Sequence, residues 1–136
     1  MSYAVASALQ SAIFDALRAD AALGALVGSG IFDAVPSGAA PDLYVLIGAE
    51  TVRASNDKTG TGARHQLEIS VVSDAPGFSA AKAAAGAVCD VLDRADLSLS
   101  RGRLVYLNFD RATAQRSDGA AGRTIDLRFV ARVEDT

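Results

Sequence analysis

The sequence is poor in the residues that most often carry enzyme chemistry. Its 136 residues include one cysteine, one histidine and no tryptophan. Cys89 is alone, so an intramolecular disulfide is impossible, and its alanine-rich helical surroundings indicate a small buried apolar side chain. A zinc site needs about four Cys, His or carboxylate ligands at compatible spacing. Because one Cys and one His separated by a helix do not supply that set, we expect no metal and no other cofactor.

Long apolar runs and an excess of positive charge are also missing. No apolar run approaches the roughly 20 residues that span a bilayer. The first 20 residues lack a positively charged region followed by an apolar one, so we expect no secretory signal. The formal net charge is −3, and no predicted helix is rich in lysine or arginine. These absences argue against a membrane protein and against sequence-specific DNA recognition.

The charges that are present are unevenly distributed along the chain. Residues 1–100 carry 6 basic and 11 acidic residues, whereas residues 101–136 carry 7 arginines and 5 acidic residues. An acidic body with a basic C-terminal third is able to present faces of opposite sign, which suits head-to-tail assembly. Arginines that simply point from strands into water explain the same pattern, and the sequence leaves both interpretations open.

The hydrophobic pattern predicts a single domain over residues 1–136. Half of the residues are hydrophobic, which is enough for a core in a chain of this length. The strictest alternation of apolar and polar residues runs from His65 to Val71 and from Ile125 to Val133. We expect an α+β fold, a two-layer sandwich in which two long helices pack on one face of a mainly antiparallel sheet of about 4–5 strands. The periodicities place helices at about 2–18, 21–27 and 79–95, and strands at about 31–36, 43–52, 65–73, 103–115 and 123–133.

His65 is the one candidate for a catalytic base, and the glycines of the sequence GTGAR before it superficially resemble a phosphate-binding loop. Nucleophilic catalysis needs a base beside a nucleophile, and His65 instead begins a strand on its apolar side. A phosphate loop needs Gly-Lys-Ser/Thr at the start of a helix that follows a strand, whereas this loop precedes a strand. We therefore predict no enzyme and no catalytic residue, and we interpret His65 as structural or solvent-facing.

Two long polar segments, residues 53–64 and 112–122, are the features that suggest a binding role. Loops of this length in a compact domain are usually functional or disordered. We expect the first loop, with Gly60 and Gly62 as hinges, to become ordered only at a contact with a partner. The candidate interface residues in and beside the two segments are Arg53, Asn56, Asp57, Lys58, Thr59, Arg111, Gln115 and Arg116.

Four features together resemble the tail-terminator (tail-completion) family of long-tailed phages and phage-like gene transfer agents. The first is the opening stretch that contains IFDAVP and YVLIG, and the second is the block KTGTGARHQLEISVVSDAPG with the helix that follows it. The third is GRLVYLNFDRATAQRSDGAAGRTIDLRFVARVE, and the fourth is the spacing of these segments. The likeness covers nearly the whole chain.

The resemblance implies a structural virion protein rather than an enzyme. Members of this family form a hexameric ring at the head-proximal end of the tail tube, stop tube polymerisation and provide the surface to which the head-completion (stopper) protein docks. DNA passes through the lumen without sequence-specific binding. The expected partners are therefore other copies of the chain, the tail tube protein and the stopper protein. The expected location is the head–tail junction of a virion or gene transfer agent particle assembled in the bacterial cytoplasm.

Two other functions remain open on the sequence alone. One is a head-completion stopper or adaptor ring of the same assembly, which differs from a terminator in the partner with which it co-assembles. The other, less favoured, is a small-molecule-binding α+β domain or enzyme, which would differ in its size in solution.

Overall fold

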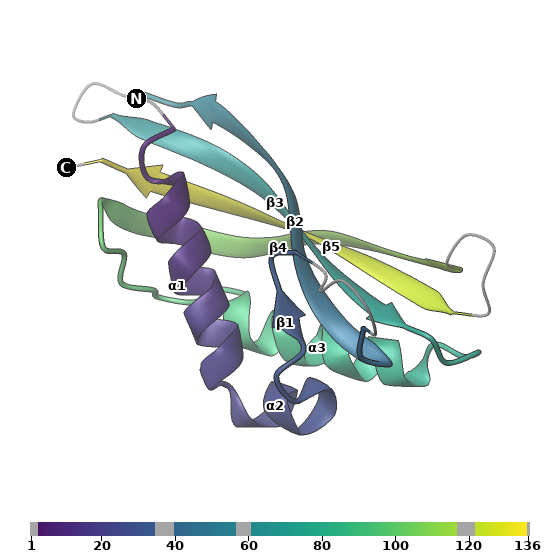
Figure 1. Ribbon diagram of the computed structural model, residues 1–136. Coiled ribbons are helices and arrows are strands. Elements are labelled where there is room, and N and C mark those ends of the chain that lie inside the picture. The colour runs from purple at the N-terminus through teal and green to yellow at the C-terminus, as the bar shows by residue number, and fades with distance from the viewer. Residues whose placement is uncertain (1–2, 35–39, 57–60, 117–121, 136) are drawn as a thin grey trace.

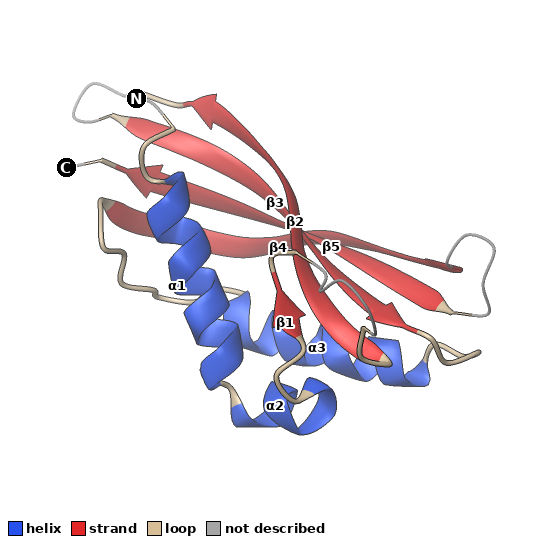
Figure 2. Cartoon of the chain, in the orientation of Figure 1, coloured by secondary structure: helices blue, strands red, loops and turns tan. Residues whose placement is uncertain are grey.

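A five-stranded sheet, covered on one face by helices, makes up the described part of the chain. The computed structural model describes residues 3–34, 40–56, 61–116 and 122–135. Three helices lie together in one layer beneath the sheet (Figures 1 and 2). They are α1 (Ala6–Ala19), α2 (Ala21–Val27) and α3 (Ser79–Leu92), and the strands are β1 (Ile31–Phe32), β2 (Leu43–Ala54), β3 (Gly62–Ser73), β4 (Arg103–Arg116) and β5 (Arg123–Glu134).

The strand order is β1-β2-β3-β5-β4, so β3 and β5 are central and β4 forms an edge. Strand β3 pairs antiparallel with both β2 and β5, and β4 pairs antiparallel with β5. Strand β1 instead pairs in parallel with β2, through Ile31 opposite Val45 and Phe32 opposite Leu46.

The α+β class predicted from the sequence is confirmed, and two details of the prediction are wrong. The sheet is mixed rather than mainly antiparallel, because β1 adds to it in parallel. The helices are short rather than two long ones, since α1 and α3 have 14 residues each and α2 has 7. Helix α1 begins at Ala6 rather than near residue 2, and α3 ends at Leu92 rather than near residue 95, because Arg94 adopts a left-handed φ of 63°.

The short helix α2 begins and ends where local sequence signals place it. The backbone N–H of Leu23 donates to Asp20 Oδ2 at 2.9 Å, so Asp20 caps the first turn. Gly28 follows the last turn with a φ of 61°, a backbone conformation that favours glycine. Within the described residues, none of these helices has the length and apolar content needed to cross a membrane.

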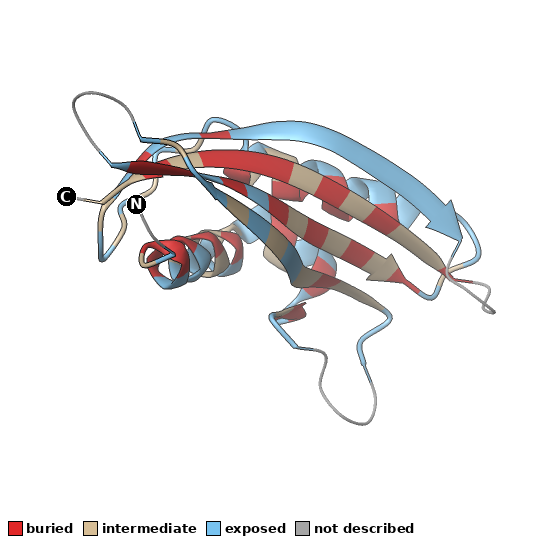
Figure 3. Cartoon of the chain, turned by 90° about the horizontal axis from the view of Figure 1, so that it is seen from above, coloured by how far each residue is buried: buried red, intermediate tan, exposed pale blue. Residues whose placement is uncertain are grey.

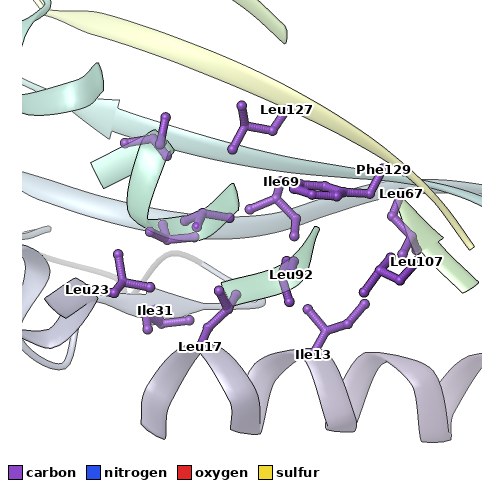
Figure 4. Packing of buried hydrophobic residues seen from close by; sticks show 14 of the residues in the cluster. Ile13, Leu17, Leu23, Ile31, Leu67, Ile69, Leu92, Leu107, Leu127 and Phe129 are labelled. Atoms are coloured by element: carbon purple, nitrogen blue, oxygen red, sulfur yellow. The ribbon is translucent and has the colours of Figure 1, made fainter. Parts of the chain in front are cut away.

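The core lies between the inner face of the sheet and the helices. Ile13 and Leu17 of α1 and Leu92 of α3 meet Ile69 and Phe129 from the central strands (Figure 4). Phe129 is fully buried and is the largest of the fully buried side chains among the described residues. The alternation predicted for β3 and β5 is confirmed, because their inward positions are buried and most of their outward positions are partly exposed.

Candidate interaction surfaces

His65 is buried inside the protein and belongs to a chain of three polar side chains. Its side chain is fully buried, and its Nδ1 lies 2.9 Å from Glu50 Oε2. The hydroxyl of Tyr3 donates to the other carboxylate oxygen, Glu50 Oε1. This hydrogen bond and the negative charge of Glu50 raise the pKa of Tyr3 above its usual value. The three residues join the N-terminal segment, β2 and β3, which is a structural arrangement.

A β-bulge in β2 brings Glu50 to His65. Ile47 pairs with Ile69, but the next paired residue of β2 is Glu50, opposite Leu67, so β2 contains one extra residue. Gly48 lies in this bulge. Without the extra residue, Glu50 would point to the outer face, because side chains alternate along a strand. Sequence reasoning missed Glu50 as the partner of His65, although a glycine within a strand is a signal of a bulge.

The geometry around His65 does not resemble a catalytic site. Its Nε2 is buried and has no hydrogen-bond partner among the described residues, and its Nδ1 faces a carboxylate rather than a nucleophile. No group of three or more His, Cys, Asp or Glu residues in the described parts of the chain is arranged to hold a metal ion. Of the two interpretations of His65, the structural one therefore agrees with its position. The other, that His65 faces solvent, is wrong, because the side chain is fully buried.

The first predicted loop is shorter than residues 53–64. Arg53 lies in β2 and Arg64 lies in β3, where the two are directly opposite each other. Both side chains are exposed on the outer face. Asn56 follows β2, and its Oδ1 accepts a hydrogen bond from the Gly62 N–H at 3.3 Å, which helps to close the hairpin. The other predicted interface residues of this loop, Asp57, Lys58 and Thr59, lie outside the described residues.

An arginine row crosses the outer face of the sheet at this end. Arg53, Arg64 and Arg132 occupy paired positions on β2, β3 and β5. Arg132 Nη1 donates to Ser55 Oγ at 2.7 Å, and its Nη2 lies 3.8 Å from Glu134. Like charges directly opposite one another are unfavourable in a sheet, so this row is more basic than folding requires. It suits an anionic partner.

The second predicted set lies on the edge strand rather than in a loop. Residues 112–116 belong to β4, so any loop in the expected span 112–122 begins after Arg116. Residues 117–121 lie outside the described residues. Arg111, Gln115 and Arg116 are exposed, and they pair with Arg128, Thr124 and Arg123 of β5. The strand predicted at about 103–115 is confirmed to within one residue, and the polar segment 112–122 overlaps its last part.

The two candidate sets are not brought together. Arg53 lies near the C-terminal end of β2, and Arg116 is the last residue of β4; these two strand ends lie at opposite ends of the sheet (Figure 1). The two ends are separated by the nine residue steps from Arg64 to Ser73 of β3, a span of about 30 Å at 3.3 Å per residue. The structure thus has two separate polar ends rather than one composite site.

The charge asymmetry of the sequence corresponds to a division between layers. Residues 1–42 and 74–100, which form the helical layer with its connections and β1, carry eight acidic and three basic residues, a net of −5. The four long strands carry eight arginines and five acidic residues, a net of +3. This division favours the interpretation that the molecule has faces of opposite charge. The acidic and basic parts are divided between helices and sheet, however, and not at residue 100 of the sequence.

The edge strand also exposes apolar side chains that the sequence pattern assigns to the core. Val105 and Phe109 each keep 40% of their surface exposed, and Tyr106 keeps 36%. Tyr3 is exposed as well, and four further aromatic residues are half-buried. For Val105, Tyr106 and Phe109 an edge position is the reason, because β4 has a neighbouring strand on one side only.

Comparisons with known proteins assign this fold to a family. The sequence profile of the family described as "Tail completion protein gp17" matches residues 11–134. A chain in the solved structure described as "Virion of native gene transfer agent (GTA) particle" is 59% identical, with a TM-score of 0.92. That similarity covers 98% of this chain and 99% of the other. No curated protein matches the chain.

Proposed function

This chain belongs to the tail completion protein gp17 family, and we propose that it is the tail terminator of a gene transfer agent or phage particle. It is a structural protein of a phage-type tail. In the proposed role, copies of the chain form a hexameric ring on the head-proximal end of the tail tube. The ring stops tube polymerisation and presents a surface to the head-completion (stopper) protein.

The observation that carries this proposal is the full-length similarity to a chain of a gene transfer agent particle. At 59% identity over 98% of the chain, the identical residues are too numerous to lie in the core alone, because the buried residues are a minority of the described residues. Proteins that share both fold and surface are expected to share their assembly contacts. The fold alone would be weaker support, since one fold serves many functions.

The two polar ends of the sheet fit a protein that joins two different partners. A terminator contacts the tube on one side and the stopper on the other, so it needs two docking surfaces that face apart. Arg53 and Asn56 lie at the β2–β3 end, and Gln115 and Arg116 lie at the β4–β5 end. Their side chains are suited to charge-assisted hydrogen bonds with acidic or carbonyl groups of a partner.

A ring requires a head-to-tail contact between two different surfaces of the same chain. The acidic helical layer and the basic strands supply such surfaces in one molecule. Opposite charges steer subunits together more than they hold them, so we expect the free chain to be a monomer or a weak oligomer that closes into a ring on the tube. DNA would pass through the ring without sequence-specific contact.

Deletion of the gene in the producing bacterium tests the proposal. Loss of a terminator leaves tube growth unchecked, so electron microscopy should show tails of uncontrolled length that are separate from heads. Tails of normal length that fail to join heads would instead identify the chain as the stopper or adaptor, which is the alternative. A map of the head–tail joint with five or seven copies would contradict the hexamer.

Complementation with charge-reversed variants tests the two ends of the sheet. We expect Arg53→Glu or Arg116→Glu to reduce the yield of complete particles, because each removes a cation at a proposed docking surface. Arg18→Glu, an exposed position on α1, is the matched control and should support near-normal yields. Equal yields from all three variants would show that neither end binds a partner.

A further inference from the structure

An apolar groove lies between α3 and the far half of the edge strand β4. Its volume is about 250 Å³, below the roughly 300–1,000 Å³ of pockets that bind small ligands. Its size and composition suit a few apolar side chains of another protein. We call it the α3–β4 groove, and it is lined by Lys82, Ala85, Gly86, Cys89, Phe109, Ala112, Ala114, Ile125 and Leu127.

The groove is open because its own chain supplies only small side chains there. The inward residues of this half of β4 are Ala112 and Ala114, and both are exposed. On the facing helix, a Cβ atom added to Gly86 would meet no atom within 4 Å. Strand β4 is also an edge strand, and no described residue pairs with its outer side along 110–116. An apolar surface of this kind is typical of a protein–protein contact.

A second apolar surface lies on α2. The helix Ala21–Val27 contains no charged residue, although a helix that is apolar all round is normally buried. Leu23 and Val27 pack into the core. Ala22, Ala25 and Leu26 are exposed, and their spacing of three and four places them on one face. Leu26 keeps 42% of its surface exposed, and we call these three residues the α2 knob.

The groove and the knob lie on opposite sides of α3. Helix α2 contacts α3 and β2, whereas the groove lies between α3 and β4. Strands β2 and β4 are separated by β3 and β5 in the sheet, and Figure 3 shows β4 along one side of the molecule and β2 on the other. A single chain therefore cannot insert its own knob into its own groove. Two surfaces on opposite sides are what a head-to-tail ring requires.

The charges beside the two surfaces are complementary. Asp20 immediately precedes α2, whose exposed residues form the knob. Lys82 lines the groove, and Arg116 lies at the end of the strand that forms its wall. The negative charge of Asp20 beside the knob and the positive charge of Lys82 in the groove favour contact between two copies of this chain in one orientation, whereas Asp90 and Asp93 lie near Cys89 on the α3 side of the groove.

We propose that the α2 knob of one subunit inserts into the α3–β4 groove of the next, with Leu26 as its central apolar contact. The partner of the groove is thus a second copy of this chain. The inference rests on the proposed ring and goes further, because it specifies which two surfaces form the subunit contact. Small ligands and other proteins of the particle are excluded as the occupants of the groove when the ring is closed.

Cross-linking through the single cysteine tests this contact directly. Cys89 lines the groove, and a Leu26→Cys variant places a second thiol on the knob. Burial, with Asp93 and Asp90 nearby, raises the pKa of Cys89, so a short bismaleimide should be applied to assembled particles at mildly alkaline pH. We expect a ladder of covalent multimers that ends at the ring size. Ser7→Cys, an exposed position on α1, is the control and should give no ladder.

The possible outcomes distinguish a failure of the proposed knob–groove contact from a failure of the proposed ring. Particles that contain a ring of Leu26→Cys subunits but yield no ladder would overturn the proposed contact and leave the terminator function intact. A ladder from the Ser7→Cys control that equals the one from Leu26→Cys would also overturn it. Particles without any ring of this chain would refute the proposed function, and the contact with it.

Substitutions at Gly86 give a second test that does not depend on chemistry at a thiol. Gly86→Ala and Gly86→Leu both replace a glycine within a helix by a better helix former, and the Cβ atom that both add meets no atom of its own chain within 4 Å. We expect both variants to melt at or above the temperature of the unmodified chain. Only the leucine should fill the groove, and it should lower incorporation into particles by about tenfold or more, as at an interface hot spot. Equal incorporation of the two variants would overturn the proposal.

Discussion

Strands β4 and β5 are neighbours in the sequence and in the sheet, yet they face different surroundings. Every inward residue of β5 from Ile125 to Val133 is buried, whereas β4 buries only Leu104 and Leu107 among its 14 residues (Figure 3). Both strands contain alternating apolar side chains. The difference arises because β5 lies between two strands and above α3, while β4 is an edge strand that extends past the helices.

The contrast indicates different roles for the two strands. Strand β5 contributes its side chains to the core of the domain. The far half of β4 presents an exposed surface that another molecule is able to contact. An exposed edge strand with apolar side chains is a liability in a free protein, because it invites pairing with other chains. In a subunit of an assembly the same feature is useful, which is consistent with a family whose members are parts of a particle.

The largest expected difference between the strands concerns their two facing phenylalanines. Phe129 of β5 and Phe109 of β4 are in edge-to-face contact, with ring centroids 5.9 Å apart. Phe129→Ala should lower the free energy of unfolding by about 3–5 kcal/mol, because it empties a fully buried site. Phe109→Ala should cost about 1–2 kcal/mol, since that ring is 40% exposed. Urea unfolding of the free chain measures both, and equal losses would contradict the division between the strands.

A smaller loss of stability is expected from His65 on the other side of β5. His65→Ala should lower the free energy of unfolding by about 2–4 kcal/mol, because it removes a fully buried side chain and a hydrogen-bond partner of Glu50. His65→Asn should recover part of this loss, since its amide N–H is able to donate to Glu50. Chemical denaturation checks both values, and a stable alanine variant would refute the structural role of His65.

The smallest effect is expected where α3 is tethered to β4. The backbone N–H of Phe109 donates to Asp93 Oδ1 at 2.9 Å, and the N–H of Arg94 donates to the Leu107 carbonyl at 2.7 Å. Asp93→Ala should therefore lower the free energy of unfolding by only about 0.5–1 kcal/mol, because the N–H is then free to bind water. Hydrogen exchange should speed up at Phe109 but not at Phe129. Unchanged exchange at Phe109 would show that the tether is absent in solution.

Much of the fold was determined by the sequence itself. The strict alternation over residues 65–71 and 125–133 placed β3 and β5 and their inward faces, because side chains of a strand alternate and one face must avoid water. Asp20 and Gly28 placed both ends of α2 through their local hydrogen-bonding and backbone preferences. The quoted motifs were also sufficient for the family, which the profile match over residues 11–134 confirms.

The extent of the elements was less predictable, because ends of helices and strands depend on contacts more than on local preference. Residues 112–115 were assigned both to the end of a strand and to a polar loop segment, and the structure decides for the strand, because pairing with β5 keeps them extended to Arg116. The two-residue strand β1 is too short to show a period, so its parallel pairing with β2 could not be read from the sequence.

Tertiary structure alone decided which residues meet. The bulge in β2 turns Glu50 inward to His65, and a one-residue shift of this kind reverses the faces of a strand. The α3–β4 groove is formed by residues up to 45 positions apart in the sequence, from Lys82 to Leu127. It exists only because the edge strand β4 extends beyond α3, the helix that packs on β3 and β5. Local sequence determines periodicity and caps, whereas a surface shared by α3, β4 and β5 depends on how whole elements are placed.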